Sequence, residues 1–190
     1  ATVTPSPTIN TTYTVIGTTA GCTGSAVVTV TVNPLPTITL TATQPSICPG
    51  QSATLSASGA ITYTYSSGSP IVSPTVTTVY TATGTSATGC TNTQTVQVTV
   101  NPVPTLTITN STPTICAGSS ASLTAAGTAT GYVWNPGALT GTNVTPTPTI
   151  TTVYTLTGTN ASGCTVQAQT TVVVIPNPVE IGRASCRERV

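Results

Sequence analysis

The stretch Gln97-Val-Thr-Val-Asn-Pro-Val-Pro104 decides the fold, because it occurs three times along the chain. Almost the same residues form Thr29-Val-Thr-Val-Asn-Pro-Leu-Pro36, and an altered copy forms Thr171-Val-Val-Val-Ile-Pro-Asn-Pro178. Valine alternates with polar residues before the prolines, which is typical of a half-buried strand. Proline fixes φ and stiffens a short linker. We therefore interpret the chain as tandem repeats whose last strands end at these linkers.

Other segments recur at matching places in each copy. Thr78-Val-Tyr-Thr-Ala-Thr-Gly84 matches Thr152-Val-Tyr-Thr-Leu-Thr-Gly158, and Thr12-Tyr-Thr-Val-Ile-Gly17 is the first copy. Ser46-Ile-Cys-Pro-Gly50 likewise matches Thr114-Ile-Cys-Ala-Gly118.

Within each copy the apolar residues follow a period of two, between turns rich in Gly, Pro and Asn. About a quarter of all residues are Thr, which is β-branched and suits a pleated surface. Six or seven such strands in about 70 residues predict an all-β fold of tandem antiparallel β-sandwiches. The predicted domains are the C-terminal half of a repeat at 1–34, complete repeats at 35–102 and 103–176, and a tail at 177–190.

Every charged side chain of the protein lies in residues 180–190, and residues 1–179 contain no Asp, Glu, Lys, Arg or His. General acid–base catalysis needs a group that titrates usefully, hard cations need carboxylates, and phosphates need Lys or Arg. The composition therefore predicts a protein that is not an enzyme. It also predicts no cofactor, no metal site and no binding of nucleic acid.

The segment Glu180-Ile-Gly-Arg-Ala-Ser-Cys-Arg-Glu-Arg-Val190 resembles the reading-frame translation of a short-read sequencing adapter. The alternative is a short basic arm that contacts an anionic surface. An artefact segment carries no information about the fold, so Cys186 is not a disulfide candidate. Together with the absent initiator Met, it leads us to expect an internal fragment assembled from environmental DNA.

The five cysteines of residues 1–179 are expected to be structural. Each complete repeat has one in the turn after its first strand and one in its last hairpin turn, and we expected these turns to share one end of the sandwich. The predicted disulfides are Cys48–Cys90 and Cys116–Cys164, with the partner of Cys22 missing. A metal site is disfavoured by the lack of His and of Cys-x-x-Cys, and a catalytic thiol by the lack of a base. Disulfides indicate an oxidising compartment.

The aromatic residues are predicted to fill the core. Trp134 and its counterpart Tyr65 lie on a middle strand, and Tyr80 and Tyr154 begin the penultimate strand, where they resemble a tyrosine corner. The alternative is that Tyr132 and Trp134 are exposed and stack on a glycan.

The repeated motifs resemble the Ig-like or PKD-like tandem repeats of very large Bacteroidota cell-surface proteins, including gliding and adhesin-type proteins. The resemblance covers nearly all of residues 1–179 and implies export to the cell surface. No apolar run approaches the roughly 18 residues of a membrane-spanning helix, so membrane insertion is not expected.

The function expected from this resemblance is a non-catalytic structural repeat region of an extracellular fibre or stalk, which can self-assemble into filaments. Its expected partners are other copies of itself or neighbouring repeats. Residues 1–34 would be completed either by strands of a neighbouring subunit or by sequence outside the chain. The alternative function is an adhesin module that binds surface glycans.

Overall fold

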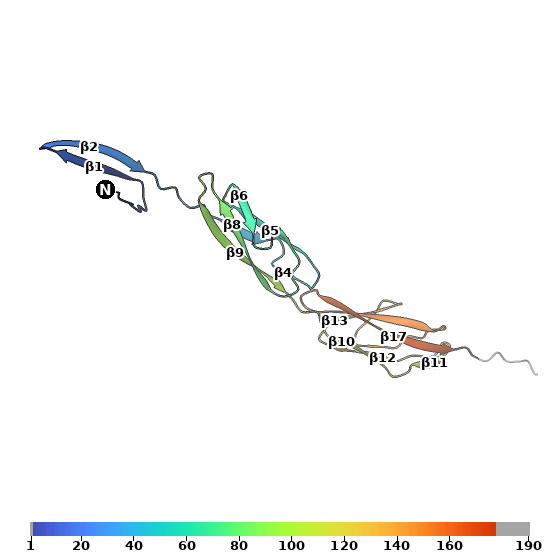
Figure 1. The fold of residues 1–190 in the computed structure, drawn as a ribbon. Helices are drawn as coiled ribbons and strands as arrows, with labels where there is room; N and C mark the ends of the chain where they lie inside the picture. Colours follow the sequence, from blue (N-terminus) through green and yellow to red (C-terminus); the bar gives the residue numbers. More distant parts are fainter. Residues whose placement is uncertain (1, 178–190) are drawn as a thin grey trace, which may run out of the picture. The chain divides into compact units, whose positions relative to one another are not determined.

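The computed structural model describes residues 2–177, which form strands and no helix (Figure 1). The described chain falls into two compact units. The first runs to Thr99 but leaves out the turn Cys48–Gln51, and the second contains that turn and the chain from Val100 onwards. The proposed adapter segment 180–190 and Cys186 lie outside the described residues.

The first strands form a two-stranded antiparallel hairpin. β1 (Thr11–Thr19) pairs with β2 (Cys22–Val30), and the two-residue turn has positive φ at Ala20 (46°) and Gly21 (87°). Positive φ at both turn residues suits the right-handed twist of a hairpin. Most of its apolar side chains are exposed, including Val15 and Val28 at 65% and 57%.

The rest of the first unit is a sandwich of two sheets, ordered β3-β5-β7 and β4-β9-β8-β6. The strands of this sandwich are β3 (Thr39–Ala42), β4 (Ser46–Ile47), β5 (Ala53–Ser58), β6 (Thr62–Tyr65), β7 (Ile71–Val72), β8 (Thr78–Thr85) and β9 (Thr91–Val100). All of them lie within the predicted repeat 35–102.

The second unit has the same two sheets with one strand added, ordered β10-β12-β15 and β11-β17-β16-β13-β14. Its strands are β10 (Leu106–Asn110), β11 (Thr114–Cys116), β12 (Leu123–Gly127), β13 (Gly131–Asn135), β14 (Leu139–Thr140), β15 (Asn143–Val144), β16 (Thr152–Thr159) and β17 (Thr165–Ile175). The added strand β14 lies in the stretch where this repeat is longer than the previous one.

The strand order confirms the predicted fold class, tandem Ig-like antiparallel sandwiches. In the first sandwich β3, β5 and β7 form one sheet, and β6, β8 and β9 belong to the other. In the second, β10, β12 and β15 form one sheet, and β13, β16 and β17 belong to the other. This division of the strands between two sheets is that of immunoglobulin domains. The first strand divides between the sheets: β10 pairs with β12, whereas β11 crosses over and pairs with β17 in parallel. This parallel pair was not predicted from the sequence.

Each sandwich buries the alternating apolar residues on its inward faces. Leu55, Ala82 and Val98 are at most 2% exposed in the first sandwich, and Leu123, Leu156 and Val172 are 0% exposed in the second. Fully burying a Val or Leu side chain contributes roughly 1.5–3 kcal/mol. The two sandwiches therefore have equivalent cores, although the second is centred on Trp134.

Candidate functional site

The last-hairpin cysteines lie in matching five-residue turns that run from Ser86 to Cys90 and from Asn160 to Cys164. The backbone N–H of residue 86 donates to the carbonyl of Cys90 (2.9 Å), and that of residue 160 to the carbonyl of Cys164 (3.0 Å). The side chains of Ser86 and Asn160 accept the cysteine N–H at 3.1 and 2.9 Å. Both sulfur atoms lie 3.8 Å from the carbonyl oxygen of a linker Asn, Asn33 for Cys90 and Asn101 for Cys164.

The first-strand cysteines begin a second kind of matching turn. The carbonyl of Cys48 accepts the N–H of Gln51 at 3.1 Å, and the carbonyl of Cys116 accepts that of Ser119 at 3.0 Å. The third residue of each turn is a glycine with a φ of 85° or 80°, which other residues rarely adopt. Four cysteines therefore occupy two kinds of site, each present in both repeats.

The disulfide of the structure joins one site of each kind across consecutive repeats. Cys48 is bonded to Cys164, with the Cα atoms 5.5 Å apart. Cys22, Cys90 and Cys116 are free thiols. The predicted pairs Cys48–Cys90 and Cys116–Cys164 are therefore wrong in this structure, and Cys164 has its partner in the repeat before its own.

The parallel strand pair explains why a disulfide within one repeat does not form. Cys116 lies opposite Ile175, at the end of β17, whereas Cys164 directly precedes the start of β17. A strand rises about 3.3 Å per residue, so the 11 residues of β17 separate these cysteines by roughly 35 Å. A disulfide needs Cα atoms within about 7 Å. The two turns lie at opposite ends of the sandwich, so the prediction that they share one end is wrong.

The same geometry brings Cys48 to Cys164. Strand β4 lies next to β9, and Thr99 donates its N–H to the carbonyl of Pro45 at 2.9 Å, as Val173 does to Pro113 at 2.8 Å. Cys48, directly after β4, therefore lies near the C-terminal end of β9, where the chain continues into Asn101. The sulfur of Cys164 contacts that same residue, so the linker places the two cysteines together.

The aromatic residues divide between the core and the surface. Trp134 is 0% exposed and donates its indole N–H to the carbonyl of Gly141 at 3.0 Å, and Tyr154 is 4% exposed. Tyr65 and Tyr80 are only half-buried, so they fill the core less than predicted. Tyr132 is also half-buried, and its hydroxyl lies 3.4 Å from the carbonyl of Gly127. A glycan cannot stack on Trp134 in this structure.

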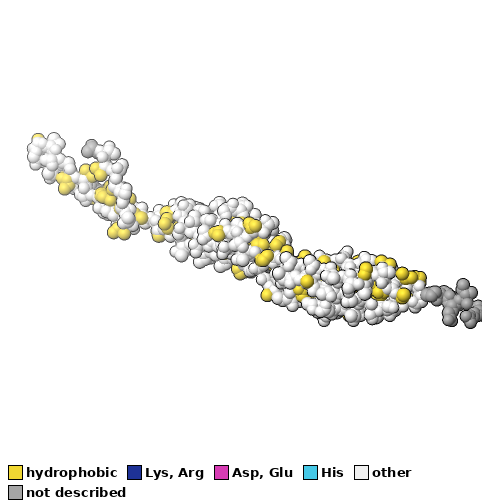
Figure 2. All heavy atoms as spheres, turned by 90° about the horizontal axis from the view of Figure 1, so that it is seen from below, with side chains coloured by type: hydrophobic (Ala, Val, Ile, Leu, Met, Phe, Trp, Pro, Cys, Tyr) yellow, Lys and Arg dark blue, Asp and Glu magenta, His cyan; other side chains and the backbone are white. Residues whose placement is uncertain are grey.

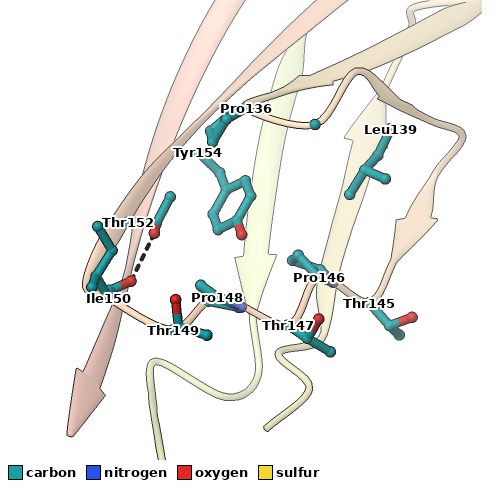
Figure 3. A pocket seen from close by; sticks show the side chains of 11 residues that line it. Pro136, Leu139, Thr145, Pro146, Thr147, Pro148, Thr149, Ile150, Thr152 and Tyr154 are labelled. Atoms are coloured by element: carbon teal, nitrogen blue, oxygen red, sulfur yellow. Dashed lines mark hydrogen bonds between the residues drawn. The ribbon is translucent and has the colours of Figure 1, made fainter. Parts of the chain in front are cut away.

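An open hollow of about 520 Å³ lies in the second unit beside Tyr154. Figure 3 shows the Tyr154 ring between Pro136 on one side and the segment with Pro146 and Pro148 on the other. At its rim Thr152 donates to the carbonyl of Ile150 at 2.7 Å. Burial raises the pKa of the Tyr154 phenol above its ordinary value of 10.0. No sequence pattern predicts this hollow, which depends on how the Pro-rich segment folds back.

The described surface offers hydroxyl and methyl groups rather than charges. The face drawn in Figure 2 carries no acidic or basic side chain on described residues, and hydrophobic side chains are scattered over it. Between residues 2 and 177 no group of three or more potential metal-ligating side chains occurs. The same part of the chain contains no helix that is long and apolar enough to cross a membrane.

No family model and no curated protein sequence matches the chain. Among solved structures, one on host cell surface retention of a 1.5-MDa bacterial ice-binding adhesin matches with 14% identity and a TM-score of 0.40, over 87% of this chain and 74% of that chain. A Ca²⁺-stabilized adhesin of an Antarctic bacterium matches with 16% identity and a TM-score of 0.39, over 89% and 58%.

The insect immune protein hemolin matches with 13% identity and a TM-score of 0.32, over 87% of this chain and 56% of that chain. These likenesses are too distant to carry an argument about function. The assignment of the chain to the Ig-like sandwiches rests on its own strand order.

Proposed function

We propose that this chain is a non-catalytic structural repeat region of an extracellular fibre or cell-surface stalk, of the kind found in large Bacteroidota surface proteins. The observation that carries the proposal is the Cys48–Cys164 disulfide, which closes a loop with a sequence separation of 116. A stable disulfide fits an oxidising, extracellular location.

The position of this bond matters for a protein that bears load. When the chain is pulled at both ends, force passes from residue 47 through the disulfide to residue 165. Residues 49–163, which form most of both sandwiches, carry no tension. The disulfide therefore limits how far the chain can extend even if a sandwich unfolds, which suits a stalk.

The composition of the surface supports the same role. Residues 1–179 have no charged side chains, so neighbouring fibres have little electrostatic repulsion and the strand edges have no charged residues that block pairing. We infer that copies of the chain associate with one another, end to end or side by side, into filaments.

The test is single-molecule stretching of the full chain, attached at its termini, before and after reduction of the disulfide. Reduction should lengthen the fully extended chain by about 116 residues at about 3.6 Å each, or roughly 400 Å. Cys48→Ser should show the longer extension without reductant, and Cys90→Ser, which removes a free thiol, should behave as the parent. Equal extended lengths in the oxidised and reduced parent chain would refute the proposal.

A second candidate function is an adhesin module that binds surface glycans. The hollow beside Tyr154 favours it, since the proline rings and threonine hydroxyls that line the hollow can contact a sugar. A glycan array probed with the full chain and with a variant of an exposed residue that lines the hollow, Ile150→Ala, separates the two functions. Specific binding that the substitution abolishes supports the adhesin, and no binding favours the stalk.

A further inference from the structure

The disulfide occupies one site of each kind, and the matching sites hold the free thiols of Cys116 and Cys90. Cys116 lies in the same kind of turn as the bonded Cys48. In both turns the cysteine carbonyl accepts the N–H of the third residue after it, and a glycine with positive φ precedes that residue. Cys90 lies in the same kind of turn as bonded Cys164. Both free thiols are accessible, with Cys116 exposed and Cys90 partly exposed.

The surroundings of Cys90 and Cys164 agree in detail. Each sulfur lies 3.8 Å from the carbonyl of the linker Asn that enters its repeat, and each N–H is held by the side chain four residues earlier. Cys164 uses this position to meet the first-strand cysteine of the previous repeat. Cys90 is thus placed to meet a first-strand cysteine beside Asn33, as Cys164 meets Cys48 beside Asn101.

Cys116 repeats the position of Cys48 at the other end of its sandwich. Its strand β11 lies beside the end of β17, and Ala117 donates its N–H to the carbonyl of Ile175 at 2.9 Å. Asn177 on the segment that leaves the repeat also donates to the carbonyl of Ala117, at 3.4 Å. The exit of the repeat is therefore held against the turn that carries Cys116, as Cys48 is held at the exit of β9.

We propose that Cys48–Cys164 is one link of a repeating pattern, in which the first-strand cysteine of every repeat bonds the last-hairpin cysteine of the next. In this pattern Cys116 forms a disulfide with a last-hairpin cysteine, and Cys90 forms one with a first-strand cysteine, each from another copy of the repeat. The loops closed by successive links overlap, so every complete repeat is tied to both of its neighbours.

The link forms by thiol–disulfide exchange with a small-molecule or protein disulfide. The thiolate of Cys116 attacks one sulfur of the oxidant and releases one thiol, giving a mixed disulfide. The thiolate of the second cysteine then displaces the other half of the oxidant. Two protein thiols are oxidised to one disulfide, and one oxidant disulfide is reduced to two thiols.

The partner repeat has two sources, the same polypeptide or a second copy of this chain, and one experiment distinguishes them. The full chain with Cys186→Ser is refolded in a glutathione redox buffer, alone and with a further copy of residues 105–178 inserted after Pro178. The inserted copy carries Cys116→Ser, and Thr165→Ser gives its cysteine peptide a distinct mass. Free thiols are alkylated, and peptides are mapped after pepsin digestion, because residues 1–179 offer trypsin no site.

In the extended chain we expect Cys116 to lose its alkylation and to join the last-hairpin cysteine of the inserted copy, while Cys48 stays joined to the original Cys164. Cys116→Ser in the original copy is the matched control, and it should leave the inserted cysteine alkylated. In the unextended chain, a link from Cys116 to Cys90 or Cys22 of another molecule would show that a second chain supplies the partner.

Three results would overturn the proposal: Cys116 joined to Cys164 of its own copy, Cys116 joined to another Cys116, or Cys116 still alkylated in the extended chain. The proposal goes beyond the stalk function. If Cys48–Cys164 forms and Cys116 stays reduced, only the repeating pattern fails. If Cys48–Cys164 itself does not form, both proposals fail.

Discussion

Trp134 combines the two contributions that a large core residue can make. Its ring has no exposed surface, and its indole N–H reaches the carbonyl of Gly141, so the polar end of the side chain is paired inside the sandwich. Tyr65 has the matching position in the first sandwich but is only half-buried. The core packing of the second repeat therefore depends more strongly on a single side chain than the core packing of the first repeat does.

Replacement of this residue should destabilise the second sandwich. Trp134→Ala leaves a cavity and an unpaired Gly141 carbonyl, and we expect a loss of about 3–5 kcal/mol in the free energy of unfolding. Trp134→Phe keeps most of the ring and should lose less. Denaturant unfolding followed by circular dichroism measures both, with the exposed Val153→Ala as the control. A loss below that of the control would show that Trp134 does not support the core.

Tyr154 gives the described chain a pH dependence at alkaline pH only. Burial raises the pKa of its phenol, so the folded state holds this proton more tightly than the unfolded state does. The resulting stability is fully present below the ordinary pKa of 10.0 and is lost as pH rises through the higher folded value.

The melting temperature of the chain, with its free thiols alkylated, should therefore stay level from about pH 4 to 8 and fall above about pH 10. Tyr154→Phe should weaken the alkaline fall without changing the plateau. A melting temperature that moves strongly between pH 4 and 8 would contradict this prediction, because residues 2–177 contain no Asp, Glu or His.

At the scale of the strand, one repeated glycine makes room for the first strand. A Cβ atom on Gly84 would overlap Ile38 and lie 2.8 Å from the Ala60 side chain, whereas a Cβ on the equivalent Gly17 of the hairpin has no neighbour within 4 Å. The same substitution therefore meets a filled space in the sandwich and an open one in the hairpin.

Gly84→Ala should cost about 1–3 kcal/mol of stability through overpacking, and Gly17→Ala should be neutral or slightly stabilising. Hydrogen exchange of the amides in β3 and β8 reports the first effect, and that of β1 and β2 the second. Equal changes in exchange for the two variants would mean that the contact with Ile38 does not constrain the strand.

The strands also show where prediction from sequence reached its limit. Alternating valines and threonines located β9 and β17, because burial on one face imposes a period of two. β4 has two residues and β11 has three, too short for any period, so their pairing with the last strand of each sandwich could not be predicted. That pairing fixes which end of the sandwich each cysteine occupies, and for this reason the predicted disulfides failed while the fold class held.

For the whole molecule, the absence of charge between residues 2 and 177 determines how copies interact. Salt screens electrostatic interactions over about 10 Å at 0.1 M, but screening has no effect where no charged side chains are present. Contacts between copies would then depend on apolar burial and on the backbone edges of strands. Exposed valines such as Val79 and Val153, at 58% and 50%, lie on β8 and β16 and are available for such contacts.

Association of the full chain should therefore change little between low and moderate sodium chloride concentrations, as measured by sedimentation velocity at a fixed protein concentration. The double variant Val79→Lys and Val153→Lys adds one charge to each sandwich. Repulsion between copies should weaken association at low salt, and association should recover as salt screens the charges. Val79→Thr with Val153→Thr is the matched control, since it removes the apolar groups without adding charge. Association of the parent that falls steeply with salt would show that the charged tail, rather than the neutral repeats, holds copies together.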